Sequence, residues 1–512
     1  MNRIPILLAA LPLAAAAHGQ GEPATVERIV DIGKNKNQVM RTLKELTDIG
    51  PRLTGSPKLR RAQDWAMAKF RSYGLKNVRL EKWGDVPVGF ERGNRQIGRM
   101  VAPFASDIVF TTQCWMPGTE GKVLAEAVLA PATAAEATAK AAELKGKWVV
   151  LTTQTTMRGP AANQDDLKKA LETAGVAGVV YGSRDERVHS SGRWTGKTFE
   201  NRPKLVEILV RKSDHDRIVR NISFGRRPTL EFDIENKWFK GPIEQYNVVA
   251  DLPGTERPDE VVIVCGHLDS WNSPGSQGTC DNGTGSSVAV EAARILSAAR
   301  AKPKRTIRFV LWSGEEQGLH GSRGYVITHK NELEKISAVL NDDGGTNYQG
   351  GYVGLASMKP IMEAAFAPTQ RAFPELEMKF NVVETMPQGG SSDHAPFNWE
   401  GVPGFFTMES GKADYGKVWH TQFDQYKEAI PEYLIQSSTN HAVVAFNLAS
   451  LDGLLPRGPK PAPRRETENL NHNEAIGADH MYQDHDHSDD YWIDKADRMP
   501  RWIRSILPAL GR

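Results

Sequence analysis

Histidine and acidic side chains recur between residues 260 and 420 of this chain, each directly after a short apolar run or inside a loop. The candidates are His267, Asp269, Asp281, Glu315, Glu316, Asp342, Asp343, Asp393, His394 and His420. Imidazole together with carboxylates, and no cysteine among them, is a typical ligand set for zinc that acts in catalysis. Two such ions about 3.5–4 Å apart can share one activated water. The residue types therefore point to metal-assisted hydrolysis.

The elements that must position these side chains are short apolar strands alternating with helices between residues 245 and 455. The expected strands are 260–265, 306–312, 338–341 and 403–408, and the expected helices are 284–300, 318–330, 359–372 and 430–449. This alternation predicts an α/β fold with a mainly parallel sheet sandwiched by helices. Ligands of such sheets bind outside the carboxyl ends of the strands. Most candidates fall at that edge, and the others lie in loops.

Each motif alone also has an ordinary interpretation. The sequence from His267 to Asp269 is compatible with a surface turn, the Glu315-Glu316 pair with a solvated surface, and Asp281 with a helix cap. Their joint occurrence at one sheet edge favours a metal site. The adjacent glutamates then predict a division of labour, in which one binds metal and the other accepts a proton from water. Asp269 is placed to accept the second ring N–H of His267.

Five motifs, followed by His420, resemble those of the co-catalytic di-zinc exopeptidases. They are His267-Leu268-Asp269-Ser270, Asp281-Asn282-Gly283-Thr284-Gly285, Glu315-Glu316-Gln317-Gly318-Leu319-His320-Gly321-Ser322, Asp343-Gly344-Gly345 and Ser392-Asp393-His394. This family includes bacterial leucyl aminopeptidases, carboxypeptidase Q and glutamate carboxypeptidase II. The resemblance covers residues 35–115 and 240–455 and is greatest to carboxypeptidase Q-like members.

The resemblance implies two Zn²⁺ ions per chain, held by five side chains. Asp281 would bridge the two ions. His267 and Asp343 would complete the shell of one ion, and Glu316 and His420 that of the other. Asp343 is preferred to its neighbour because the glycines after it match the family pattern.

The resemblance also implies roles outside the metal shell. Glu315 would be the general base, and Asp269 would orient His267. Asp393 and His394 would shape the substrate site, with a purely structural role as the alternative. A cis peptide is expected between the bridging aspartate and Asn282.

Composition and pattern divide the chain into four parts. Residues 1–19 resemble a signal peptide, since Arg3 precedes an apolar run with small residues at its end. Residues 20–117 and 236–455 would form a discontinuous zinc peptidase domain. Residues 118–235 form an α/β insert that resembles a protease-associated domain. Residues 456–512 form a polar tail with four histidines, for which a solvated segment is favoured over weak metal binding.

The overall composition excludes several functional classes. The 512 residues carry 64 Lys and Arg against 62 Asp and Glu, a net charge of +2, which argues against a nucleic-acid-binding surface spread over the molecule. Past the N-terminus no apolar run is long enough to span a membrane. Three cysteines exclude a disulfide framework, although pairing of Cys265 with Cys280 is left open. We expect an exported protein, periplasmic or secreted.

The leading hypothesis is an exopeptidase that acts on short peptides. One alternative is a glutaminyl cyclase-like acyl transferase that uses a single zinc ion, and the other is a catalytically silent ectodomain on the same fold. The two-ion ligand set and the presence of Glu315 favour the peptidase. The sequence leaves open whether cleavage starts from the amino or the carboxyl end, and it leaves the oligomeric state open, a homodimer included.

Overall fold

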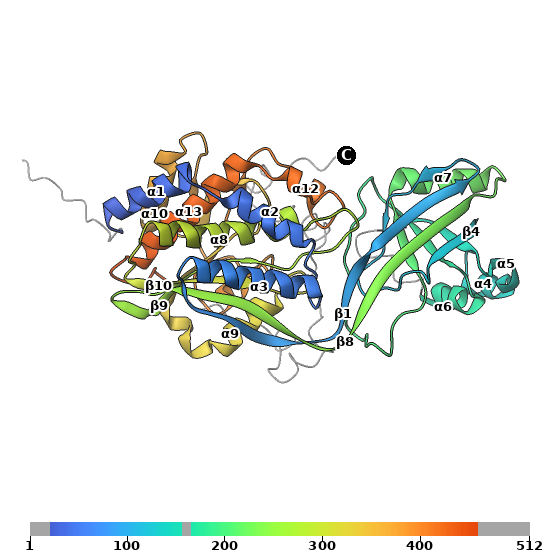
Figure 1. Cartoon of the computed structure of the whole chain (residues 1–512), viewed down its shortest axis with the longest axis horizontal. Coiled ribbons are helices and arrows are strands. Elements are labelled where there is room, and N and C mark those ends of the chain that lie inside the picture. The colour runs from blue at the N-terminus through green and yellow to red at the C-terminus, as the bar shows by residue number, and fades with distance from the viewer. Residues whose placement is uncertain (1–20, 156–164, 459–512) are drawn as a thin grey trace, which may run out of the picture.

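The protein was analysed as a computed structural model, which describes residues 21–155 and 165–458. The expected signal segment 1–19 and the histidines of the tail lie outside the described residues. Two lobes are joined by two long strands, β1 (Lys76–Ala102) and β8 (Thr229–Leu252), which run side by side from one lobe into the other (Figure 1).

The first lobe contains the predicted mainly parallel sheet. Its parallel strands are β15 (Gly404–Phe406), β11 (Ile336–Asn341), β9 (Arg257–His267) and β10 (Arg305–Trp312), in that spatial order. The sheet then continues through β8, which pairs antiparallel with β10, and β1, which pairs antiparallel with β8. The four predicted strands are thus all present, and β9 extends as far as His267 itself.

Helices cover both faces of this sheet, because its strands carry buried apolar side chains on both faces. One face packs against α1 (Pro23–Asn35), α3 (Pro57–Ser72), α8 (Thr284–Ala298), α10 (Lys359–Ala372) and α13 (Pro431–Ala449) (Figure 1). The opposite face packs against α9 (His320–Thr328) and α11 (Ala395–Trp399). Along β9, Val262 and Val264 belong to the first core, whereas Ile263 and Cys265 belong to the second.

Two successive helices open the described part of the chain. The chain forms α1 and then α2 (Val39–Ile49), with a break between them. Asn37 stabilises this break from both sides, because its Nδ2 donates to the Gly33 carbonyl at 2.7 Å and its Oδ1 accepts from the Val39 N–H at 2.8 Å. The asparagine therefore caps both helices.

The second lobe has its own parallel strands and helices. The strands are β4 (Lys122–Leu129), β5 (Trp148–Thr155), β6 (Gly178–Ser183) and β7 (Glu207–Val210), and the helices are α4 (Ala134–Ala139), α5 (Ala141–Leu144), α6 (Asp165–Ala174) and α7 (Lys212–Ser223). Short strands β2 (Ser106–Asp107) and β3 (Phe110–Thr111) precede them. Because Met100 and Phe110 are buried in its core, this lobe begins within β1, before residue 118.

Two further observations concern the chain as a whole. In the part of the chain that the structure describes, no helix is both long and apolar enough to cross a membrane. Cys114, Cys265 and Cys280 are all buried and free, so Cys265 and Cys280 do not pair.

Candidate metal centre

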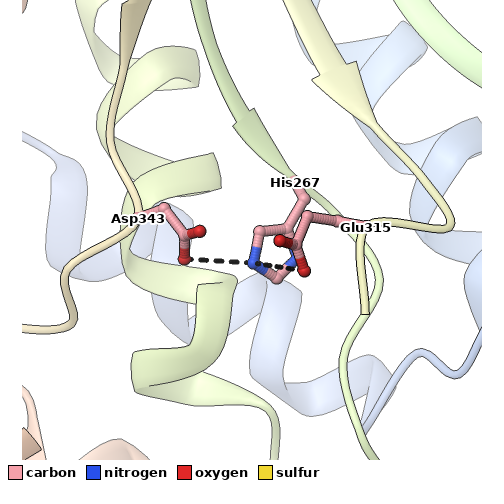
Figure 2. Close-up of side chains that lie close together, drawn as sticks. All are labelled: His267, Glu315 and Asp343. Carbon is pink, nitrogen blue, oxygen red and sulfur yellow. Dashed lines mark hydrogen bonds and ion pairs between the residues drawn. The ribbon is translucent and has the colours of Figure 1, made fainter. Parts of the chain in front are cut away.

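Three of the predicted residues meet at the carboxyl edge of the sheet because of the strand register. His267 ends β9 opposite Trp312, the last residue of β10, and Asn341 at the end of β11 lies opposite Cys265. The loops after β10 and β11 therefore place Glu315 and Asp343 beside the His267 ring (Figure 2). His267 Nε2 lies 3.1 Å from Asp343 Oδ1 and 3.8 Å from Glu315 Oε2.

A second histidine lies on the other side of Asp281. This aspartate lies in the segment Thr279–Gly283, which leads into α8, and its own backbone is not helical, with φ −122° and ψ 95°. Its Oδ1 lies 3.4 Å from His267 Nε2, and its Oδ2 lies 3.1 Å from His420 Nε2. His420 Nε2 is also 3.1 Å from Glu316 Oε2. Asp281 thus presents one oxygen to each histidine, and each histidine has a further carboxylate of its own.

This arrangement fits bound zinc by the chemistry of its donors. Donor atoms gather in two groups, and within each group they all lie within 4.8 Å of one another. One group is His267 with Glu315 and Asp343, and the other is His267 with Asp281 and Glu316. The side chains of both groups are largely buried. Asp281 Oδ2 is buried and accepts no hydrogen bond from the residues that the structure describes. An oxygen left in this state is what a cation would satisfy.

Burial and the charges of the cluster shift the pKa values of its members strongly. Burial and then the Asp281 charge raise the pKa of Glu316 to about 8, and burial raises that of Glu315 well above its usual value. Burial alone would lower the pKa of His420, but Glu316 and Asp281 raise it to about 9. The buried carboxylates outnumber the cations that could balance them, so protons or metal ions are needed here.

Asp269 contacts His267 in a different way from the one predicted. His267 Nδ1 lies 3.0 Å from the main-chain oxygen of Asp269 and 3.7 Å from its carboxylate. The carboxylate accepts a 2.9 Å hydrogen bond from Thr54 Oγ1 and longer ones, at 3.4 and 3.3 Å, from the N–H groups of Glu315 and Glu316. Asp269 therefore orients the imidazole through its backbone and the glutamate loop through its side chain.

The two adjacent aspartates after β11 point to different surroundings. Asp343 faces His267, and its Oδ2 accepts a short hydrogen bond from Ser392 Oγ. Asp342 instead accepts a 2.6 Å hydrogen bond from Gln349 Nε2, which lies away from the cluster and also contacts His441. The choice of Asp343 as the ligand candidate agrees with this geometry.

Asp393 and His394 lie at the start of α11 and are buried. The His394 ring packs 5.4 Å from that of Phe406, and burial lowers the pKa of this histidine to about 4. Burial raises the pKa of Asp393 to about 8. Neither residue belongs to the two groups of donor atoms, and their role in shaping the substrate site stays a prediction.

Arg52 is a residue beside the site that sequence reasoning missed. Its guanidinium is fully buried and donates to the carbonyls of Leu268 at 2.7 Å, Gly278 at 2.7 Å and Gln277 at 3.2 Å. Burial lowers its pKa to about 10, so it stays charged at neutral pH. Arg52 thereby ties the segment after His267 to the loop before Asp281.

Replacement of Arg52 by Met is expected to lower the free energy of unfolding by about 3–5 kcal/mol, because several buried carbonyls lose a charged donor. Urea denaturation measures this loss. Arg60→Met is the control, since that arginine forms an exposed pair with Asp64 on α3 and its loss is expected to cost less than about 1 kcal/mol. Equal effects of the two changes would contradict the role of Arg52.

Comparisons with known proteins agree with this geometry. Residues 247–445 match peptidase family M28. Carboxypeptidase Q from Bos taurus is 28% identical over 450 residues, covering 86% of this chain and 91% of the relative. An aminopeptidase from Pseudomonas aeruginosa is 30% identical over 262 residues, covering 46% of this chain and 44% of the relative.

A solved structure supports the same assignment. The crystal structure of a peptidase M28 precursor from Shewanella amazonensis matches with a TM-score of 0.62 and 25% identity, covering 85% of this chain and 98% of that one. This match confirms the predicted α/β fold class. The predicted resemblance is confirmed as well: residues 247–445 match peptidase family M28, carboxypeptidase Q is similar over most of the chain, and these matches indicate a metallo-exopeptidase.

Proposed function

We propose that this protein is an exported exopeptidase that hydrolyses short peptides with two zinc ions per chain. The observation that carries the proposal is the position of Asp281, whose two carboxylate oxygens face two different histidines. His267 and Asp343 would hold one ion, and His420 and Glu316 the other. Bound zinc would polarise the scissile carbonyl and lower the pKa of water at the site.

Glu315 is the residue proposed to move the proton. Its Oε2 is farther from His267 Nε2 than Asp343 Oδ1 is, at 3.8 against 3.1 Å, although both face the same ring. Its backbone N–H is held by the Asp269 carboxylate. Glu315 would accept a proton from the attacking water and deliver it to the leaving amine, which is the usual role of a general base in peptide hydrolysis.

The two alternative functions have less support. A single-zinc acyl transferase would need only one set of ligands, whereas the site provides a second histidine with its own glutamate. A silent ectodomain would have no use for Glu315, which is present and buried beside the cluster.

The likeness to carboxypeptidase Q extends over both lobes, whereas the aminopeptidase match covers less than half of the chain. Dipeptides with a free carboxylate are therefore the first substrates to test. Comparing free dipeptides with amino-blocked and carboxyl-blocked ones would give the direction of cleavage. The second lobe is proposed to be a protease-associated domain, and export is proposed from the charged and apolar segment at residues 1–19.

Chelation is expected to abolish activity and to lower the melting temperature. A metal that binds only the folded state stabilises it by about 4 kcal/mol at a free concentration 1,000 times its Kd. Elemental analysis should find about two zinc ions per chain before chelation, and added zinc should restore both activity and stability. A folded and active protein without metal would contradict the proposal.

A further inference from the structure

One segment of the second lobe leaves that lobe and lies against the loop that carries His420. This segment, residues 186–194, is part of the connection from β6 to β7. The Ser190 N–H donates to the His420 carbonyl oxygen at 2.9 Å. Arg187 Nη1 donates to the Gly416 carbonyl at 2.7 Å, in the short helix α12 (Tyr415–Val418) that precedes His420. The backbone of a proposed metal ligand is therefore held from the other lobe.

The side chain of Ser190 secures this contact. The residue is fully buried, and its Oγ lies 2.7 Å from Ser273 Oγ and 3.0 Å from Thr111 Oγ1. Ser273 belongs to the segment between His267 and Asp281, whereas Thr111 belongs to β3. The serine thus joins both lobes at the point where its N–H reaches the His420 backbone.

Gln422, two residues after His420, makes the other part of the contact. Its Oε1 accepts from the Val188 N–H at 2.9 Å, and its Nε2 donates to the Glu186 carbonyl at 2.9 Å. The carboxamide therefore pairs with the backbone on both sides of Arg187. Gln422 is only 8% exposed, so both hydrogen bonds are shielded from competing water.

The conformation of His420 explains why such support matters. Its φ is +58°, in the left-handed region that is uncommon for residues other than glycine. A residue in that region keeps its conformation only where its surroundings enforce it. Within the His420 loop, Thr421 Oγ1 donates to the Lys417 carbonyl at 2.8 Å. From the first lobe, Ser273 Oγ also donates to the His420 carbonyl, at 3.4 Å, a longer contact than the 2.9 Å one from the Ser190 N–H of the second lobe.

We infer that the 186–194 segment, acting through Gln422 and Ser190, positions the His420 imidazole for the metal ion that this histidine would share with Asp281 and Glu316. The second lobe then supports one of the two metal positions selectively. His267 ends a core strand, and its Nδ1 is held within its own lobe by Asp269. Gln422 is a positioning residue here, and the inference rests on the proposed two-ion function.

The test is zinc titration of the metal-free full chain, which gives a dissociation constant for each ion. Gln422→Ala is expected to weaken one of the two sites by about 10–100-fold, the usual effect of removing a group that orients a metal ligand. The other site should change by less than about threefold. Ser190→Ala should weaken the same site by a smaller factor, since it keeps the N–H that contacts His420.

Two controls separate positioning from general stability. Gln63→Ala removes an equally buried carboxamide, 3% exposed, which donates to the Tyr246 carbonyl and does not contact the His420 loop. It should lower the melting temperature and leave both zinc affinities unchanged. In a His420→Ala background, Gln422→Ala should add no further loss at the weakened site, because the group that it orients is already gone.

The outcomes distinguish the inference from the function on which it rests. Equal weakening of both sites by Gln422→Ala, or an effect no larger than that of Gln63→Ala, would overturn the inference and leave the two-ion function intact. An unaltered protein that takes up fewer than two ions would overturn the proposed function, and this inference with it, before any variant is measured.

Discussion

Glu315→Gln is expected to lower kcat by about 10²–10⁴-fold or more while zinc content and the fold are retained. The amide has nearly the size of the carboxylate, but it cannot accept a proton from the attacking water, and general base catalysis contributes a factor of this order. Substrate affinity should survive, because Glu315 is proposed to act on the water. Elemental analysis, KM and kcat measured on the same preparation check the result.

Glu316→Gln is the matched comparison, because the neighbouring side chain belongs to the other part of the site. Glu316 Oε2 lies 3.1 Å from His420 Nε2, and its Oε1 accepts from the Trp271 N–H at 3.2 Å. Its loss is expected to deplete one zinc ion, and activity should fall together with the metal. If Glu315→Gln sheds zinc while Glu316→Gln keeps it, the two roles are reversed. Normal turnover in both variants would exclude the proposed mechanism.

Asp281→Ala is expected to remove both ions, or to weaken both sites together, and to abolish activity. Each of its carboxylate oxygens faces a different histidine, at 3.4 and 3.1 Å, so the change affects both positions at once. His267→Ala and His420→Ala should each weaken one site more than the other. Zinc titration of the three variants distinguishes a shared ligand from two separate ones.

Asp342→Asn is the control for Asp281→Ala. Asp342 is also buried, but its carboxylate accepts from Gln349, which contacts His441 and neither His267 nor His420. An amide at this position still offers an oxygen to Gln349, so both zinc ions should be retained. If Asp281→Ala kept full occupancy and turnover, or if Asp342→Asn lost zinc to the same extent, the assignment of the bridging residue would be wrong.

The sequence predicted those parts of the site that follow from strand register. His267, Glu315 and Asp343 come directly at or after parallel strands, and parallel strands bring their carboxyl ends to one edge. Their proximity therefore depends on local patterns that a sequence displays. The cis peptide between Asp281 and Asn282, expected from the family resemblance, is also present.

Other features could not be predicted, because they depend on contacts between distant segments. No local pattern indicates that Gln422 pairs with the backbone around Arg187, or that the buried guanidinium of Arg52 binds the carbonyls around Asp281. Asp269 was expected to accept the second ring N–H of His267 with its side chain. The main-chain oxygen of the same residue lies at hydrogen-bonding distance from His267 Nδ1 instead. Spacing along the chain does not distinguish these two acceptors.

The path of the long strands β1 and β8 through both lobes could not be predicted either. Alternation of polar and apolar side chains does not show that one strand serves two lobes. β8 pairs with β4 near Thr229 and with β10 near Leu252, and it pairs with β1 along most of its length. A sequence-based boundary at residue 118 therefore cannot describe where the lobes separate.

This pairing also constrains the order in which the protein folds. Lys76 pairs with Asp251 and Ala102 with Thr229, so β1 is synthesised before the second lobe and its partner after it. The edge of the catalytic sheet closes only when that whole intervening stretch has been made, and closing a long flexible loop costs entropy. A second lobe that is already compact brings the two strands together and reduces this cost. Such non-local pairing slows folding, and it makes early formation of the second lobe the favourable route to the finished enzyme.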